Sequence, residues 1–277
     1  VQVAHEQLAQ LANELKDQSL VALAQTEQAS ALARQESFSE ALDHWVPAFL
    51  IYSAQGVQRS MGYNLLVRGA ALARMGRYDE AQDLLNQASQ IANKPGGELK
   101  SLSLDLQLTE AQVAITQGKF VEAKGIIDKV LTKAGSDFPS LTWEAKLLSS
   151  LAQAYSGNAA TAKQNAPAKL ARAQLVLAET ALLSGDAETA LANSQQAQEI
   201  FARGTQSDSE WRAWVIAAAA SKKTGDALKA KEYAAKGAEI LASLQGRWGT
   251  VSYEAYLRRP DIQRLHQQLD QIVSAAN

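Results

Sequence analysis

The segment Gly76-Arg77-Tyr78-Asp79-Glu80-Ala81 decides the fold, because it joins the end of one helix to the start of the next. Glycine readily adopts the left-handed conformation that ends a helix, and the Asp-Glu pair favours the N-terminus of the helix that follows. The segment Gly118-Lys119-Phe120-Val121-Glu122-Ala123 has the same arrangement further along the chain. Apolar residues at helical spacing follow both segments, for example Leu84, Leu85, Ala88 and Ile91 after the first. The two segments therefore predict helical hairpins that repeat along the chain.

Six copies of this turn can be aligned, and most neighbouring copies lie about 40 residues apart. The turn positions are Glu36, Gly76, Gly118, Gly157, Gly185 and Gly225. On the helix that follows, every copy has alanine at the same offset, at Ala41, Ala81, Ala123, Ala162, Ala190 and Ala230. On the helix that precedes, every copy has a small residue at the same offset, at Ala29, Gly69, Ala111, Ser150, Ala178 and Ala218. Small residues on both helices of a hairpin allow the two helix axes to approach closely.

The composition supports an all-α fold and excludes several classes of protein. Helix-favouring residues dominate the 277-residue chain, and Val/Ile/Thr-rich runs with strand periodicity are missing. The net charge of -2 argues against a nucleic-acid-binding surface. The absence of cysteine excludes disulfides and thiolate zinc sites, and no apolar run is long enough to span a bilayer.

The turn, small-residue and alanine positions resemble the motif of the tetratricopeptide repeat (TPR) family. The length of the repeat resembles that of the longer-repeat subclass found in multidomain bacterial signalling and regulatory proteins. The resemblance implies a right-handed αα-superhelix of about six hairpins with a C-terminal capping helix. Two copies depart from the motif: the first has Glu36 in place of glycine. In the fourth, Pro167 limits the second helix to about two turns.

The repeat pattern divides the chain into three parts. Residues 1–18 are predicted to form either the second helix of a truncated preceding repeat or an N-terminal capping helix. Residues 19–244 form the repeat array, and residues 245–277 form a C-terminal capping segment. Within that segment we expect Trp248 and Tyr256 to cover the apolar face of the last repeat.

Motifs that would indicate an enzyme, a metal site or a bound cofactor are missing from the sequence. His5, His44 and His266 lie at no ligand spacing, and neither a nucleophile elbow nor a phosphate-binding glycine loop is present. The basic pairs Lys222-Lys223 and Arg258-Arg259 are interpreted as solvated faces. The sequence thus predicts a non-enzymatic protein that needs neither cofactor nor metal.

The resemblance to TPR proteins implies that the first helix of each hairpin lines a concave binding groove. The matching positions form a mixed apolar and polar set: Leu23, Thr26, Ser30, Tyr63, Leu66, Ala70, Arg74, Asp105, Leu108, Gln112, Glu144 and Leu147. An alternative for Leu66 and Leu108 is that they pack neighbouring repeats together.

These observations predict a scaffold that binds a peptide or a partner domain in the groove, within a larger bacterial signalling or regulatory protein. The alternatives are a small-molecule-sensing regulatory domain and a module that assembles with copies of itself. The partner is expected to be protein rather than nucleic acid, and the array carries no membrane span. The compartment stays open, with the cytoplasm slightly favoured.

Overall fold

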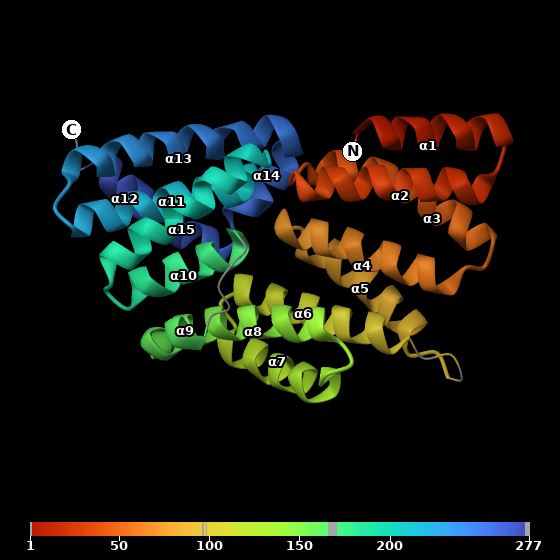
Figure 1. Cartoon of the computed structure of the whole chain (residues 1–277), viewed down its shortest axis with the longest axis horizontal. Helices are drawn as coiled ribbons and strands as arrows, with labels where there is room; N and C mark the ends of the chain where they lie inside the picture. The colour runs from red at the N-terminus through yellow and green to blue at the C-terminus, as the bar shows by residue number, and fades with distance from the viewer. Residues whose placement is uncertain (1, 96, 98, 166–170, 275–277) are drawn as a thin grey trace. The chain divides into compact units, whose positions relative to one another are not determined.

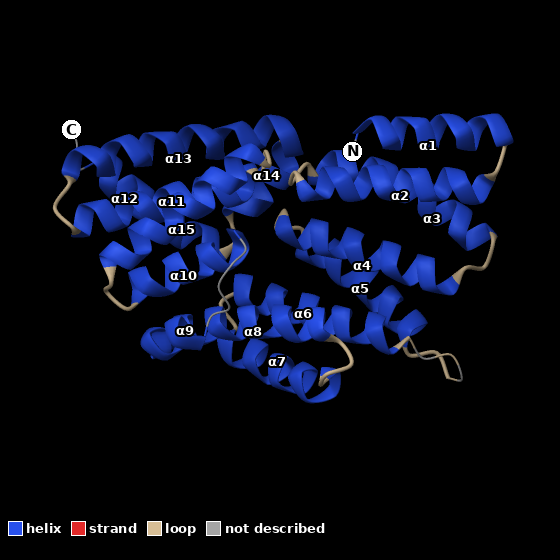
Figure 2. Ribbon diagram, viewed as in Figure 1, coloured by secondary structure: helices blue, strands red, loops and turns tan. Residues whose placement is uncertain are grey.

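The chain folds into helices joined by short turns, as the computed structural model shows (Figures 1 and 2). The structure describes residues 2–95, 97, 99–165 and 171–274, and it contains no strand in these ranges. The α-helices are α1 (Gln2–Leu15), α2 (Gln18–Arg34), α3 (Phe38–Ala54), α4 (Gln58–Arg74), α5 (Tyr78–Ala92), α6 (Lys100–Thr116), α7 (Phe120–Ala134), α8 (Pro139–Gln153), α9 (Ala159–Asn165), α10 (Ala171–Leu183), α11 (Ala187–Arg203), α12 (Ser207–Lys223), α13 (Ala227–Trp248), α14 (Thr250–Leu257) and α15 (Pro260–Ser274). A short π-helical segment, η1 (Ala154–Asn158), lies between α8 and α9. The predicted all-α solenoid of helical hairpins is confirmed.

The hairpin turns have the geometry that their sequences predict. All six turn residues have positive φ angles: Glu36 (58°), Gly76 (78°), Gly118 (78°), Gly157 (89°), Gly185 (87°) and Gly225 (87°). At the second turn the amide of Arg77 donates to the carbonyl of Leu72 at 2.9 Å, and at the third Lys119 donates to Ala114 at 2.8 Å. These bonds satisfy carbonyls that the helix end leaves without an intrahelical partner, as in the Schellman motif. The first turn has the same geometry although Glu36 takes the place of glycine.

The aligned small residues are buried where the two helices of a hairpin meet. Each of the six alanines that follow a turn is at most 2% exposed. At Gly69 an added Cβ would lie 2.9 Å from the side chain of Leu85 and 3.2 Å from the carbonyl oxygen of Ala81. The two columns of small residues therefore set the close packing of the hairpins, since a larger side chain would push the helices apart.

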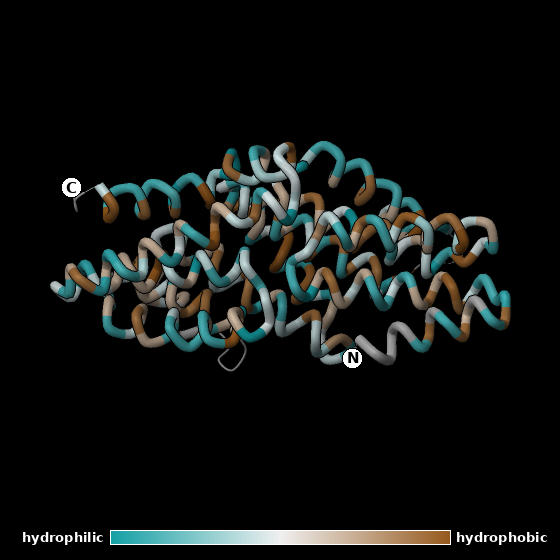
Figure 3. Tube along the Cα trace, turned by 90° about the horizontal axis from the view of Figure 1, so that it is seen from above, coloured by the Kyte–Doolittle hydropathy of each residue, from teal (hydrophilic) through white to brown (hydrophobic). Residues whose placement is uncertain are grey.

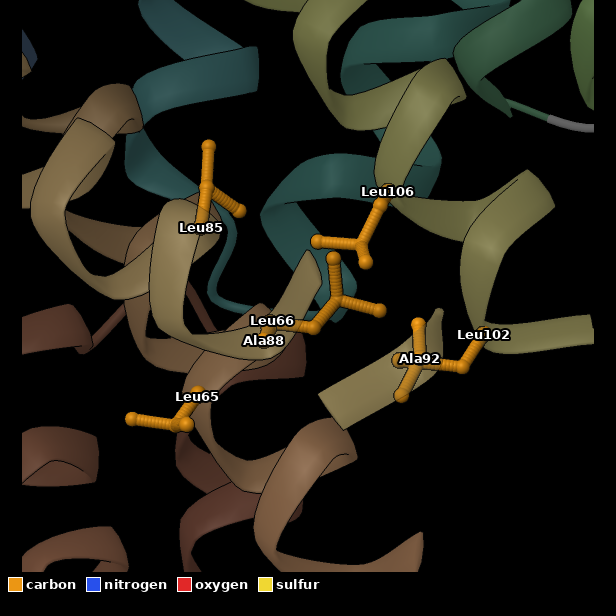
Figure 4. Close-up of a cluster of buried hydrophobic side chains, with 7 residues drawn as sticks. All are labelled: Leu65, Leu66, Leu85, Ala88, Ala92, Leu102 and Leu106. Carbon is orange, nitrogen blue, oxygen red and sulfur yellow. The ribbon is translucent and has the colours of Figure 1, made fainter. Parts of the chain in front are cut away.

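The chain divides into two compact units, the first of which is formed by Val1–Leu106 and Arg247–Tyr256. In this unit α2 packs against α3 and α4 packs against α5. Apolar residues alternate with polar ones along the helices (Figure 3). A buried cluster joins α4, α5 and the start of α6 (Figure 4): Leu65, Leu66, Leu85, Ala88, Ala92, Leu102 and Leu106. This cluster holds successive hairpins of the first unit together.

The segment Arg247–Tyr256, here called the returning segment, packs against the turn of the first hairpin. The indole N–H of Trp248 donates to the carbonyl of Glu36 at 2.8 Å. The ring of Trp248 lies 5.6 Å from that of Phe38, centroid to centroid. The prediction that Trp248 covers the last repeat is therefore wrong. Both partners lie near the other end of the chain, and helical periodicity carries no information about contacts so distant in sequence.

Other residues of the returning segment also contact hairpin turns. Arg247 donates from Nη2 to the hydroxyl of Ser37 at 2.8 Å. Tyr256, predicted with Trp248 to cover the last repeat, is fully buried and lies edge-on to the Trp248 ring at 5.1 Å. An added Cβ at Gly76 would overlap the backbone of Ala255, so glycine is needed at this turn for close approach as well as for its φ angle.

The second unit is formed by Gln107–Gly246 and Leu257–Asn277. In this unit α10 packs against α11, α11 against α12, and α12 against α15. Helix α9 has seven residues, which confirms the predicted two-turn helix in the fourth copy. Pro167 itself lies outside the described residues.

Candidate binding site

In the first hairpin, the predicted groove residues lie on α2 and differ in exposure. Leu23 is 42% exposed, a high value for a leucine. The hydroxyl of Thr26 lies 3.1 Å from that of Tyr52 on α3, and Ser30 donates to the carbonyl of Thr26 at 2.8 Å. Leu23 is therefore the apolar side chain of this set that is available for contact.

On α4, the predicted residues include two that are held by neighbouring hairpins. The hydroxyl of Tyr63 lies 2.6 Å from that of Ser101 on α6. Arg74 forms a 2.8 Å ion pair with Glu36 at the first turn. Leu66 is 6% exposed and belongs to the buried cluster, so its side chain packs the repeats together. Ala70 is half-buried.

Arg74 also contacts an aromatic ring. Its guanidinium lies 5.1 Å from the centroid of Phe38, within the range of a cation–π interaction. The Glu36 side chain is only 4% exposed, whereas that of Arg74 is 24% exposed. Arg74 therefore compensates a nearly buried carboxylate while part of its own side chain stays accessible.

The predicted residues on α6 and α8 are mostly buried or paired. Leu108 is 4% exposed and Leu147 is 1% exposed, and both serve the core of the protein. Glu144 accepts a hydrogen bond from Arg172 on α10 at 2.8 Å. Asp105 and Gln112 are half-buried on α6. Asp105 belongs to the first unit with the residues of α2 and α4, whereas Leu108, Gln112, Glu144 and Leu147 belong to the second.

The second unit contains a largely buried group of ion pairs, here called the ionic network, that the sequence pattern did not predict. It consists of Glu179 on α10, Arg212 on α12, and Arg259, Asp261 and Arg264 at the C-terminal end of the chain. Arg259 donates from Nε and Nη2 to the two carboxylate oxygens of Asp261, at 3.0 and 2.7 Å. Arg212 lies 3.9 Å from Asp261 and 4.0 Å from Glu179.

Arg264 completes the ionic network from α15. Its Nη2 lies 3.7 Å from Glu179 Oε1, and its guanidinium lies 3.9 Å from the centroid of the Tyr155 ring. The network therefore links α15 to both α10 and α12 by charge.

The basic pair Arg258-Arg259 is only partly the solvated pair that the sequence predicts. Arg258 is exposed, as expected, but Arg259 is 1% exposed, so the interpretation is wrong for Arg259. Its partner Asp261, which lies two residues further along the chain, makes that burial tolerable.

Burial shifts the ionisation of two members of the network. Desolvation raises the pKa of Glu179, although the neighbouring Arg212 and Arg264 act in the opposite direction. Desolvation also lowers the pKa of Arg264, while Glu179 and Asp261 favour its charged form. The carboxylate and the guanidinium therefore depend on one another for their charges.

Within the described part of the chain, the structure groups no three His, Asp or Glu side chains that could hold a metal ion. The Nδ1 atom of His44 lies 2.7 Å from Gln25 Oε1, and that of His266 lies 3.1 Å from Asp270. No helix in the described ranges has the length and apolar character needed to cross a membrane.

Neither a protein-family model nor a curated protein sequence matches the chain. Among solved structures, the chain is similar to PilW, described as a widely conserved type IV pilus biogenesis factor, with a TM-score of 0.50 and 19% identity over 89% of this chain and 98% of that chain. It is also similar to BtubC (BKLC) from P. vanneervenii, with a TM-score of 0.48 and 15% identity over 78% of this chain and 92% of that chain. The fold is TPR-like. At these identities the likeness concerns the fold alone.

Proposed function

We propose that this chain is a non-enzymatic scaffold that binds a segment of a partner protein along the first helices of its hairpins. The observation that carries the proposal is the pair of residues Tyr63 and Arg74 on α4. Both are held in place by a neighbouring hairpin, and both keep part of their side chain accessible. Tyrosine and arginine are among the residue types that most often dominate binding energy at protein interfaces.

The fixed position of these side chains favours binding. A side chain that is already ordered loses less conformational entropy when a partner docks, and more of the contact energy then appears as affinity. Tyr63 gains its order from Ser101 on the next hairpin, and Arg74 from Glu36 on the preceding one. The exposed Leu23 supplies an apolar contact on α2 of the same unit.

The proposal also gives a role to the polar groove residues and places the array in a larger protein. Asp105 would orient a partner by polar contact in the first unit, and Gln112 and Glu144 would do so in the second. We place the array within the longer-repeat TPR subclass and within a larger bacterial signalling or regulatory protein. The fold neighbour PilW is described as a biogenesis factor, which is compatible with a scaffold but says nothing of this chain's partner.

Site-specific photo-crosslinking tests the proposal. A photoreactive amino acid replaces Leu23 on α2 in one variant and Leu50 on α3 in the other, since both leucines are exposed, at 42% and 63%. Each variant is irradiated in lysate of the source cells and its crosslinked products are identified by mass spectrometry. The proposal expects a defined partner that crosslinks from Leu23 and not from Leu50.

Equal crosslinking from both positions, or none from Leu23, would contradict the groove. A third variant combines Tyr63→Ala with the photoreactive residue at position 23, and its crosslinking should be reduced because the aromatic contact is lost. Arg74 is left unchanged in this test, since its loss would also remove the ion pair with the nearly buried Glu36.

A further inference from the structure

Three consecutive helices of the second unit each contribute two side chains to a partly exposed group, here called the aromatic site. Gln195 and Gln198 come from α11, Glu210 and Trp214 from α12, and Tyr233 and Lys236 from α13. The two members of each pair are three or four residues apart and therefore lie on the same face of their helix. All six belong to the second unit.

The two rings of the aromatic site pack against one another and carry a cation. The ring centroids of Trp214 and Tyr233 lie 5.1 Å apart. The ammonium group of Lys236 lies 4.8 Å from the centroid of the Trp214 ring and 6.0 Å from that of Tyr233, within the range of a cation–π interaction. Trp214 is half-buried, and the Lys236 side chain is 45% exposed. The Trp214 ring thus already accepts a cation at a place that solvent reaches.

Glu210 adds a negative charge that the chain does not compensate. Its Oε1 accepts from Gln198 Nε2 at 3.1 Å and from the indole N–H of Trp214 at 3.4 Å. Among the described residues none forms an ion pair with Glu210, and Lys236 is instead paired with Glu232 at 2.8 Å. The Glu210 carboxylate is therefore held in position while it lacks a counter-ion.

The aromatic site also offers acceptor oxygens that solvent reaches. Oε2 of Glu210 and the side-chain oxygen of Gln198 accept no hydrogen bond from a described residue. Both residues are half-buried, but neither oxygen is one of the fully buried polar atoms that lack a partner. The two oxygens are therefore accessible, and a ligand with several N–H groups can donate to them.

Contacts between the three helices hold the aromatic site in place before a ligand binds. Gln195 Nε2 donates to the hydroxyl of Tyr233 at 2.9 Å and so ties α11 to α13. At Gly237 on α13 an added Cβ would lie 3.3 Å from Cγ2 of Val215 and 3.4 Å from Cβ of Trp214, so α13 packs closely on α12 here. Side chains that are already ordered lose little conformational entropy when a ligand binds.

The chemistry of the aromatic site favours a guanidinium over other cations. A guanidinium is planar, stacks on aromatic rings and donates two parallel N–H groups to a carboxylate. A quaternary ammonium could lie over the ring but has no N–H group for Glu210 or Gln198. The two carboxylates of Glu210 and Glu232 against the one ammonium of Lys236 leave one negative charge, which a single cation neutralises.

We infer that the aromatic site binds an arginine side chain of a partner protein. The guanidinium takes the place of Lys236 over the Trp214 ring, donates to Glu210 Oε2 and donates a further N–H to the side-chain oxygen of Gln198. Lys236 is a weak competitor, because it is exposed and its ion pair with Glu232 joins adjacent turns of one helix. The aromatic site shares no residue with the proposed groove, so its test does not depend on the scaffold proposal.

Titration of the full chain with N-acetyl-arginine amide, followed by amide and indole NMR shifts, tests the inference. Saturable shifts are expected on α11, α12 and α13 and at the indole N–H of Trp214, with millimolar affinity for so small a probe. N-acetyl-citrulline amide lacks the charge and tetramethylammonium lacks the N–H groups, so both are expected to bind at least about tenfold more weakly. Equal binding of either probe, saturable shifts confined to other helices, or no saturable shift would overturn the inference.

Two variants assign the roles of the side chains. Glu210→Gln should weaken binding of N-acetyl-arginine amide about tenfold, whereas the matched control Glu122→Gln, at an exposed position on α7, should not. Lys236→Ala should strengthen binding about threefold, because it removes the competing cation from the ring. The control Lys231→Ala removes another exposed lysine of α13 and should change the affinity by less than about twofold. Unaltered affinity in Glu210→Gln, or affinity that Lys236→Ala does not raise, would contradict the inference.

Discussion

The two units of the chain are stabilised by different kinds of long-range contact. In the first unit, the returning segment contributes aromatic rings and hydrogen bonds to backbone carbonyls, as Trp248 does at Glu36. In the second unit, α15 is held by the ionic network, in which Arg259 and Asp261 are almost fully buried. Apolar and neutral contacts depend little on pH, whereas buried charges require each partner to keep its charge. Units of the same repeat fold can therefore be stabilised either by aromatic and hydrogen-bond contacts or by buried ion pairs.

The largest effect is expected from the ionic network. Arg259→Met should lower the free energy of unfolding by about 3–5 kcal/mol, because it leaves the carboxylate of Asp261 buried without its bidentate partner. The matched control Arg258→Met removes the exposed neighbouring arginine and should change stability by less than about 0.5 kcal/mol. Urea unfolding of both variants measures the difference. Equal effects would show that the network does not stabilise the second unit.

The next largest effect is expected at the hairpin turns, where two glycine variants separate the cost of backbone conformation from the cost of packing. Gly76 and Gly118 have the same φ angle of 78°, but only Gly76 has a neighbour, Ala255, where a Cβ would lie. Gly118→Ala should cost about 1–2 kcal/mol, the penalty of the left-handed conformation. Gly76→Ala should cost about 1–3 kcal/mol more, since the returning segment must shift. Unfolding in urea gives both values, and equal losses would argue that the returning segment does not pack on this turn.

A smaller effect is expected when the indole N–H of the returning segment is removed. Trp248→Phe keeps an aromatic ring beside Phe38 but leaves the carbonyl of Glu36 without this donor. The loss should be about 1–2 kcal/mol in the free energy of unfolding. Trp45→Phe serves as a control for the loss of a tryptophan, because Trp45 is equally buried but its indole N–H has no hydrogen-bond partner in the structure. If the control variant lost as much free energy of unfolding as Trp248→Phe, the hydrogen bond to Glu36 would not account for the loss.

The smallest effect is expected in the pH dependence of stability. Burial raises the pKa of Glu179 in the folded state, so the folded chain holds this proton at pH values where the unfolded chain has released it. The contribution of Glu179 to stability is therefore greatest below its unfolded pKa of about 4.3 and is lost as the pH rises through the folded pKa. The slope is at most about 1.4 kcal/mol per pH unit.

The variant Glu179→Gln isolates this contribution. The free energy of unfolding of the wild type minus that of the variant should fall as the pH rises above about 4.3. Denaturant unfolding at a series of pH values measures this difference. A difference that rises with pH would mean that Arg212 and Arg264 outweigh the burial of the carboxyl group.

The repeat architecture could be predicted from the sequence because its determinants are local. A turn residue with positive φ, an alanine on the helix after it and a small residue on the helix before it act within one hairpin, over distances that helical periodicity covers. Even Glu36, which departs from the motif, has the predicted turn geometry. The two-turn helix α9 likewise follows from the short fourth copy and its proline.

The sequence by itself thus determined the all-α hairpins, their turns and the small residues that pack them. Only the tertiary structure decided that Trp248 bonds to Glu36, that Arg259 is buried with Asp261, and that Arg264 lies close to Glu179. Most of these contacts join segments far apart in the chain. A residue type and its spacing fix what a helix can bury, but whether a charge or a polar group becomes buried is set by which distant helices come together around it.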